Sequence, residues 1–460
     1  MSKPTADRPG AVLVGVQLPD VSDLEHATHL AELGRLVRTL GYDTVATLTQ
    51  RRAGTGAGTV LGTGKLKELA KLTGGQGVIA SGAADRTSKA KERWEAEAAA
   101  EEDAEDPADA PVAADPQVVA GEKPTVVVVD HELSPSQLRN LERATGALVL
   151  DRTGVIVDIF HRHARSREAR MQVEIARLKY LAPRLRESSG RSERQQGRGA
   201  GDSAVELDRR KIRDRVAELN EGLAAVQRAQ DQRRSARRDQ LRVALVGYTN
   251  AGKSSLMRAL TGSDVLVADQ LFATLDTTVR SLQPESRPRV LVSDTVGFLR
   301  KLPHDLVASF RSTLDEALEA SLLLYVADAS DPSWEDQLEV TRTVLREIGA
   351  AEVPSLVLLN KIDQLDQATR SRLRARFPEA LLLSAHAPED IAALRQRVLD
   401  FFEAQMVEAD LQIPYAHQGL VGEVYESARV LTETFDEAGR NLRVRSLPGV
   451  VAKLARKFQA

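Results

Sequence analysis

The chain has 460 residues, enough for about three domains, and its composition of 42% hydrophobic and 28% charged residues is ordinary for a globular protein. It contains no cysteine, which excludes disulfides, iron–sulfur clusters, thiolate zinc sites and cysteine nucleophiles. No apolar stretch approaches the roughly 20 residues of a membrane-spanning helix, and the first ten residues lack the apolar core of a signal peptide. We therefore expect a cytoplasmic protein that does not enter membranes.

The first 150 residues alternate stretches typical of buried strands with stretches typical of helices. Strands are predicted at 11–18, 44–48, 77–80, 125–130 and 147–151, and helices near 23–40, 64–73 and 134–145. This alternation predicts a small parallel α/β domain over residues 1–150. Residues 92–115 carry ten acidic side chains against one arginine, so we expect a disordered acidic insertion near 84–121.

Residues 151–240 carry 22 lysines and arginines against 14 acidic residues, although the whole chain has a net charge of -3. Twenty of the 22 are arginines, which suit phosphate contacts and stacking on bases. Apolar residues recur every three or four positions at 171–185 and at 212–226, which predicts a hairpin of two helices. The Gly/Ser/Arg-rich loop at 188–203 would be its charged tip. We favour an arm that binds nucleic acid; a plain helical spacer is the alternative.

The α/β pattern begins again at residue 241. Five apolar strands are predicted, at 241–247, 290–294, 321–328, 355–360 and 380–385. They indicate a second parallel α/β domain over 241–404, followed by a small C-terminal domain over 405–460 that carries no motif. The expected fold class is therefore multidomain α/β.

A phosphate-binding loop follows the first strand of this second domain. Residues 247–254, GYTNAGKS, match G-x-x-x-x-G-K-[ST] and lead into a helical pattern. Glycines let the backbone N–H groups and the helix N-terminus surround a phosphate, Lys253 would neutralise the β- and γ-phosphates, and the hydroxyl of Ser254 would bind Mg²⁺. The nucleotide-binding residues predicted here are Gly247, Tyr248, Thr249, Asn250, Ala251, Gly252, Lys253, Ser254 and Ser255.

The base is predicted from Asn360-Lys361-Ile362-Asp363, which ends the fourth strand. The carboxylate of Asp363 can accept hydrogen bonds from N1–H and the 2-amino group of guanine, donors that adenine lacks. Asn360 would contact the other edge of the base, and the stem of Lys361 would lie on its face. A backbone N–H at Ser384 or Ala385 would meet guanine O6. These residues predict GTP as the substrate.

Asp294-Thr295-Val296-Gly297 supplies the third element of a GTPase site. Asp294 would bind Mg²⁺ through water, and the N–H of Gly297 would contact the γ-phosphate, so the segment would respond to its loss. A hydroxyl between 262 and 280 should complete the metal shell; the candidates are Thr274, Thr277 and Thr278.

Phe298 comes directly after this motif, where Ras-like GTPases have a glutamine that orients water. One interpretation is that Phe298 packs in the core. The other is that the isolated protein hydrolyses GTP slowly and that a partner completes its site. The two interpretations are compatible. The residue that positions water is not evident.

Taken together, these motifs resemble the HflX family of translation-factor-like GTPases over nearly the whole chain. The resemblance is carried by LGTGKLKEL, ELSPSQLRNLE, VALVGYTNAGKSSL, FATLDTTVR and DTVGFLRKLPHDL, among other stretches. It implies that Thr278 is the Mg²⁺ threonine and that the arm reaches toward the peptidyl-transferase region. It further implies binding to the large ribosomal subunit and splitting of stalled ribosomes, with GTP hydrolysis stimulated by the ribosome. Some members also hydrolyse ATP.

The chain departs from the family pattern at Gly199-Ala200-Gly201-Asp202, at Thr277 where the family has proline, and in the acidic insertion. We expect a monomeric GTP hydrolase that uses Mg²⁺, with Lys253 and Gly297 stabilising the transition state, and that binds the large subunit and its ribosomal RNA. One alternative is a GTPase that acts in ribosome assembly or on another RNA. The other is an RNA-binding module in which nucleotide is only structural.

Overall fold

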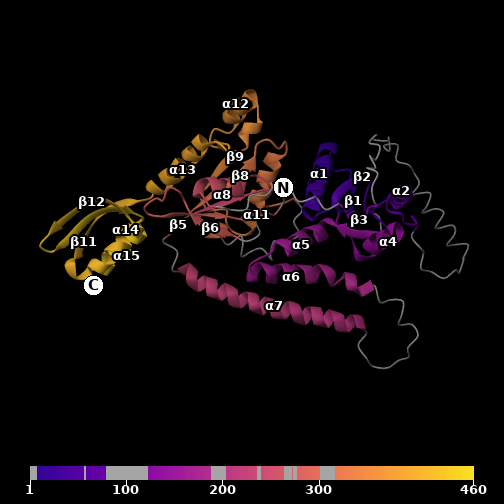
Figure 1. Ribbon diagram of the computed structural model, residues 1–460, viewed down its shortest axis with the longest axis horizontal. Helices are drawn as coiled ribbons and strands as arrows, with labels where there is room; N and C mark the ends of the chain where they lie inside the picture. The colour runs from indigo at the N-terminus through magenta and orange to yellow at the C-terminus, as the bar shows by residue number, and fades with distance from the viewer. Residues whose placement is uncertain are drawn as a thin grey trace, which may run out of the picture. The chain divides into compact units, whose positions relative to one another are not determined.

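The computed structural model describes residues 8–55, 58–78, 123–187, 204–235, 240–263, 272, 277–300 and 316–459 (Figure 1). The predicted acidic insertion and the arm loop at 188–203 lie outside these residues. By its contacts the chain forms two compact units, residues 1–162 with 176–216 and residues 163–175 with 217–460. The multidomain α/β class is confirmed, whereas the division at residues 150, 240 and 404 stays a prediction.

A four-stranded parallel sheet with the order β2-β1-β3-β4 forms the core of the first unit. The valine-rich strands β1 and β3 are almost entirely buried, as expected where helices cover a parallel sheet. The elements are β1 (Gly10–Gln17), α1 (Asp23–Thr39), β2 (Asp43–Arg51), α2 (Thr63–Thr73), β3 (Val126–Val129), α4 (Pro135–Thr145), β4 (Leu148–Asp151) and α5 (Arg152–His163).

Four of the five predicted strands and all three predicted helices of this region are confirmed. The strand predicted at 77–80 is wrong for its described half: Gly77 and Val78 form no strand, and Val78 is 60% exposed. Apolar character alone suggested a strand there, but a glycine with φ +69 breaks the extended backbone.

Asp151, the last residue of β4, connects the sheet to Tyr180 and Arg184, which lie farther along the chain in the same unit. Its fully buried carboxylate accepts hydrogen bonds from the N–H of Leu133 (3.2 Å) and of Gly154 (2.8 Å). It also accepts from the Tyr180 hydroxyl (2.6 Å) and from Nη2 of Arg184 (2.8 Å), and the Arg184 guanidinium stacks 3.3 Å from the centre of the Tyr180 ring. Burial, followed by the charge of Asp151, raises the pKa of Tyr180, so its hydroxyl remains a donor.

The two predicted arm helices are present as α6 (Arg167–Leu181) and α7 (Ala204–Ser235), with a short 3₁₀ helix η1 (Arg184–Glu187) after α6. On α7 the predicted apolar positions are less exposed than most of their neighbours, and Leu219 is buried. A Cβ on Gly222 of α7 would lie 3.3 Å from Sδ of Met171, so the two helices touch there. The 3.6-residue pattern therefore predicted both helices and the contacting face of α7.

The second unit contains a six-stranded sheet with the order β10-β9-β8-β5-β7-β6. All neighbouring pairs are parallel except β6 with β7, and β6 was not predicted from the sequence. The elements are β5 (Leu241–Gly247), α8 (Lys253–Thr261), β6 (Thr278–Ser281), β7 (Val290–Asp294), β8 (Leu322–Asp328), α11 (Trp334–Glu347), β9 (Ser355–Asn360), η3 (Ile362–Gln364), α12 (Gln367–Arg376), β10 (Leu381–Leu382) and α13 (Pro388–Glu403).

The chain ends in a three-stranded antiparallel sheet, β11-β13-β12, with its own core that includes Ile413, Val424, Leu442 and Leu454. Its elements are β11 (Val407–Pro414), η4 (Tyr415–Leu420), α14 (Val421–Ser427), β12 (Arg429–Asp436), β13 (Gly439–Ser446) and α15 (Pro448–Gln459). Within the described ranges, no helix combines the length and apolar character needed to cross a membrane.

We predict that Gly154→Ala destabilises the protein, because the added Cβ would lie 2.4 Å from the Tyr180 hydroxyl and displace it from Asp151. Overpacking at such a site costs about 1–3 kcal/mol, which a urea titration followed by circular dichroism would measure. Gly64→Ala is the matched control, since nothing lies within 4 Å of a Cβ there. Equal urea midpoints for the two variants would contradict the account of Asp151 as an anchor.

Candidate functional site

Three of the predicted motifs lie at one edge of the six-stranded sheet. Gly247 pairs with Val326, Asp294 with Leu245, and Asn360 with Asp328, so β7, β5 and β9 end at the same edge of the sheet, with their ends staggered by two residues from one strand to the next. Ligands of open α/β sheets bind at this carboxyl edge. The strand register therefore brings the phosphate loop, the D-x-x-G segment and the N-K-x-D segment side by side.

The side chain of Asn360 connects three of the segments. Its Nδ2 donates to the carbonyl of Ala251 (2.9 Å), and its Oδ1 accepts from the N–H of Ala385 (3.1 Å). Gly252 lies beneath it with φ +94, and a Cβ there would be 2.2 Å from Asn360 Nδ2. The second glycine of the phosphate loop is therefore required for two reasons, its backbone conformation and the close approach of Asn360.

Lys253 is the first residue of α8 and is only 6% exposed. Its Nζ donates to the carbonyls of Gly247 (3.0 Å) and Tyr248 (2.7 Å), which directs the ammonium along the inside of the loop. Burial lowers the pKa of Lys253 to about 8, and the nearby charge of Asp294 opposes that shift. The negative charge of a bound polyphosphate would stabilise the protonated form of this buried ammonium.

The predicted Mg²⁺ residues come from three elements. The hydroxyl of Ser254 donates to Oδ2 of Asp294 (2.7 Å), whose carboxylate is fully buried. In the β6–β7 register Thr278 is the partner of Asp294. Among the described residues no group of three His, Cys, Asp or Glu could bind a metal, so any ion here would depend on hydroxyls, one carboxylate, phosphate and water. That oxygen-rich set suits Mg²⁺, which binds few protein ligands and keeps several waters.

The segment after D-x-x-G is bonded to the phosphate loop. Phe298 is 4% exposed; its N–H donates to the carbonyl of Gly247 (3.1 Å), and its carbonyl accepts from the N–H of Thr249 (2.9 Å). Phe298 is therefore buried, as the core-packing interpretation predicted. A Cβ on Gly297 would lie 2.8 Å from Cα of Thr249 and 3.0 Å from Nζ of Lys253, so Gly297 lies directly beside the catalytic candidate.

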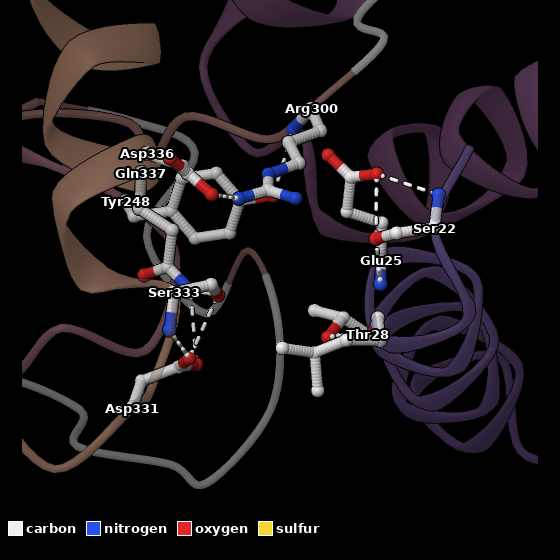
Figure 2. A network of polar contacts seen from close by, with 10 residues as sticks. Ser22, Glu25, Thr28, Tyr248, Arg300, Asp331, Ser333, Asp336 and Gln337 are labelled. Carbon is white, nitrogen blue, oxygen red and sulfur yellow. Dashed lines mark hydrogen bonds and ion pairs between the residues drawn. The ribbon is translucent and has the colours of Figure 1, made fainter. Parts of the chain in front are cut away.

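Polar contacts that the motifs did not predict link this segment to α11, and others fix the start of that helix (Figure 2). The Tyr248 hydroxyl accepts from the N–H of Arg300 (2.8 Å), and the Arg300 guanidinium pairs with Asp336 of α11 (3.0 Å). Asp331, before α11, accepts from the N–H of Ser333 (2.9 Å) and from Nε2 of Gln337 (2.9 Å), which fixes the start of that helix. Arg300 was visible in the sequence as part of DTVGFLRKLPHDL, but nothing marked Asp336 as its partner.

The base-contacting candidates also lie together, with one difference from expectation. Lys361 comes after Asn360 with φ +63, and Asp363 is exposed on η3. The N–H of Ser384 donates to Asp390 (2.8 Å), and that of Ala385 donates to Asn360. The predicted contact from this loop to guanine O6 would therefore have to share or displace one of these hydrogen bonds.

Family comparisons agree with the motifs. Residues 27–81 and 113–161 match the model described as GTP-binding GTPase N-terminal, 163–237 match GTP-binding GTPase Middle Region, and 242–361 match 50S ribosome-binding GTPase. GTPase HflX of Gluconacetobacter diazotrophicus is 68% identical over 452 residues, 98% of each chain. GTPase HflX of Escherichia coli K12 is 41% identical over 330 residues, 70% of this chain and 78% of that one.

The chain belongs to the HflX family of GTPases. The predicted family is confirmed, and so are GTP as the nucleotide and GTP hydrolysis as the activity. In this HflX-family chain the individual roles of the site residues, and Mg²⁺, remain proposals.

We predict that GDP affinity weakens as the pH rises through about 8. Phosphates favour the charged form of Lys253, whereas burial in the free protein lowers its pKa to about 8, so binding takes up a proton above that pH. The Kd should be flat below this pKa and should rise about tenfold between pH 7 and pH 9.

Isothermal titration calorimetry in buffers of different ionisation enthalpy would measure both the Kd and the proton uptake. Lys253→Arg is the control. Arginine stays protonated over this pH range, whereas any effect that comes from titration of the guanine base is the same in both proteins. The same pH dependence in both proteins would assign the effect to a group other than Lys253.

Proposed function

We propose that this protein is a Mg²⁺-dependent GTP hydrolase that binds the large ribosomal subunit and splits or rescues stalled ribosomes, with hydrolysis stimulated by the ribosome. It would act as a monomer in the cytoplasm. The observation that carries the nucleotide part of the proposal is the bridge from Asn360 to Ala251 and Ala385, which joins the phosphate and base segments into one site.

The reaction would be attack of water on the γ-phosphate. Lys253, fixed by two carbonyls, and the N–H groups of the loop and of Gly297 would stabilise the charge that develops on the phosphate oxygens. Ser254, Asp294 and Thr278 would hold Mg²⁺, which when bound neutralises phosphate charge. To contact the ion, the hydroxyl of Ser254 would give up the hydrogen bond that it donates to Asp294.

Stimulation by a partner is supported by the residue next to Gly297. The side chain of Phe298 cannot hydrogen-bond a water, and both its backbone groups already bond to the phosphate loop. A slow basal rate is expected, and a group supplied by a partner can raise the rate of a GTPase by about 10³–10⁵.

Ribosome binding is supported by charge and by family. The region that contains the GTPase motifs matches a family described as 50S ribosome-binding GTPase. Residues 151–240 carry an excess of eight positive charges, and α7 exposes Arg210, Lys211 and Arg213 to solvent. Such a surface would attract ribosomal RNA through its phosphates.

We predict that purified large subunits raise the steady-state GTPase rate by at least an order of magnitude, because they would complete a site in which Phe298 stands where a water-orienting glutamine is found in Ras-like GTPases. Phosphate release would be measured for the protein alone, with large subunits, with assembly intermediates and with free ribosomal RNA. Light scattering of intact ribosomes would measure splitting. Lys253→Ala is the control for contaminating hydrolases.

An unchanged rate in the presence of GTP binding would exclude the ribosome as activator. Greater stimulation by assembly intermediates or free RNA than by mature subunits would favour the assembly alternative. Normal RNA binding and cellular function of Lys253→Ala would favour an RNA-binding module with structural nucleotide.

We further predict that replacing Arg210 and Arg213 of α7 with glutamine weakens binding to large subunits and reduces its dependence on salt. Each lost phosphate contact should lower the slope of log K against log salt by about 1. Sedimentation with subunits over a range of KCl concentrations measures this slope. The exposed pair Arg372 and Arg374 on α12, changed in the same way, is the matched control. Equal slopes for both double variants would argue against the arm as the RNA-binding element.

A further inference from the structure

Asp328, the last residue of β8, lies at the edge of the sheet where the base segment begins. In the β8–β9 register it is the partner of Asn360, and the next N–H along, that of Ala329, donates to the Asn360 carbonyl (2.9 Å). The carboxyl end of β8 is therefore fixed against the N-K-x-D segment by backbone hydrogen bonds. No motif in the sequence marks Asp328 for a role in nucleotide binding.

The carboxylate of Asp328 makes a short ion pair with Lys361. Its Oδ2 lies 2.7 Å from Nζ of Lys361, and the two side chains are only 15% and 22% exposed. The other oxygen, Oδ1, accepts from the N–H (3.0 Å) and the hydroxyl of Ser330. Because both oxygens have protein donors, the carboxylate is fixed before any ligand arrives, and the lysine ammonium is fixed with it.

The backbone of Lys361 contributes to the same arrangement. Its φ of +63 is in the left-handed region, which residues other than glycine rarely adopt, and η3 begins at the next residue. With the backbone turned and the ammonium bound at the far end, the four-carbon stem has both ends fixed. An unrestrained lysine would lose its rotamer freedom on binding a base; this one has already lost it on folding.

We propose that Asp328 is a positioning residue for base binding: it directs the stem of Lys361 so that an apolar surface is ready to lie on the face of the guanine. The proposal rests on the guanine pocket assigned to Asn360, Lys361 and Asp363. It gives different roles to two carboxylates. Asp363 would select the base by hydrogen bonds to its edge, whereas Asp328 would strengthen the binding of any purine base through its face.

The test is a double-mutant cycle on GDP binding with wild type, Asp328→Ala, Lys361→Met and the double variant, because methionine keeps an apolar stem without the ammonium. We expect Asp328→Ala to raise the Kd for GDP and for inosine diphosphate by the same factor, about three- to tenfold. In the Lys361→Met background the same change should have no effect. The KM for GTP should rise more than kcat falls.

Two further variants separate positioning from general damage to the loop. Asp328→Asn keeps an oxygen that can accept from Lys361 and should recover part of the affinity. Asp331→Ala removes a carboxylate three residues away that accepts similar turn hydrogen bonds from Ser333 (Figure 2), and it should leave GDP affinity unchanged.

Several results would overturn the proposal. These are an unchanged Kd in Asp328→Ala, an equal loss in the Lys361→Met background, or a loss for GDP that is absent for inosine diphosphate. If the wild type binds ADP as tightly as GDP, the guanine pocket itself is wrong, and the proposal fails with it. Normal preference for GDP without coupling between residues 328 and 361 overturns the positioning role alone.

Discussion

The site depends on how closely Asn360 approaches the phosphate loop. Its amide bonds to Ala251 on one side and to Ala385 on the other, and it passes over Gly252 at a distance that admits no Cβ. Both amide groups are therefore satisfied within the buried edge of the sheet, which is the condition for burying a polar side chain at little cost. Asn360 ends β9, whereas Gly252 lies in the loop after β5, and β8 separates these two strands in the sheet. The packing of the sheet is therefore what sets this distance.

The protein uses a comparable solution in its first unit, where the carboxylate of Asp151 is buried at the end of β4. Four donors from four positions in the chain satisfy it, and Gly154 provides the space for Tyr180. In both cases a polar side chain at the carboxyl end of a parallel strand joins segments distant in sequence, and a glycine permits the approach. Multiple hydrogen bonds to one buried group define a geometry better than apolar packing does, because an unmade bond there is expensive.

The sequence predicted those parts of the structure that local chemistry determines. The phosphate loop, the helices α6 and α7 and the buried strands agree with spacing, glycine placement and apolar runs, and the D-x-x-G and N-K-x-D segments fall where strand ends predict them. The contacts of Asp328 with Lys361 and of Tyr248 with Arg300 were not predictable, because each joins residues more than thirty positions apart with no shared motif. The strand β6 was missed since its four residues, TVRS, are too polar to stand out, and the strand expected at 77–80 failed because apolar residues alone do not determine an extended backbone.

The hydrogen bonds of Phe298 constrain how GTP hydrolysis can be switched on. Its N–H and carbonyl both bond to the phosphate loop, and the segment beyond it is fixed by Tyr248 and, through Arg300, by Asp336 of α11. If, as proposed, the N–H of Gly297 contacts the γ-phosphate, it would do so from a segment that is already bonded on its far side. A Cβ on Gly297 would lie 3.0 Å from Nζ of Lys253, so this residue is close to the ammonium that is expected to contact the phosphate, while the side chain of Phe298 cannot hydrogen-bond a water. An activator that supplies the missing group from outside would leave these bonds intact, whereas one that moves the segment would have to break them.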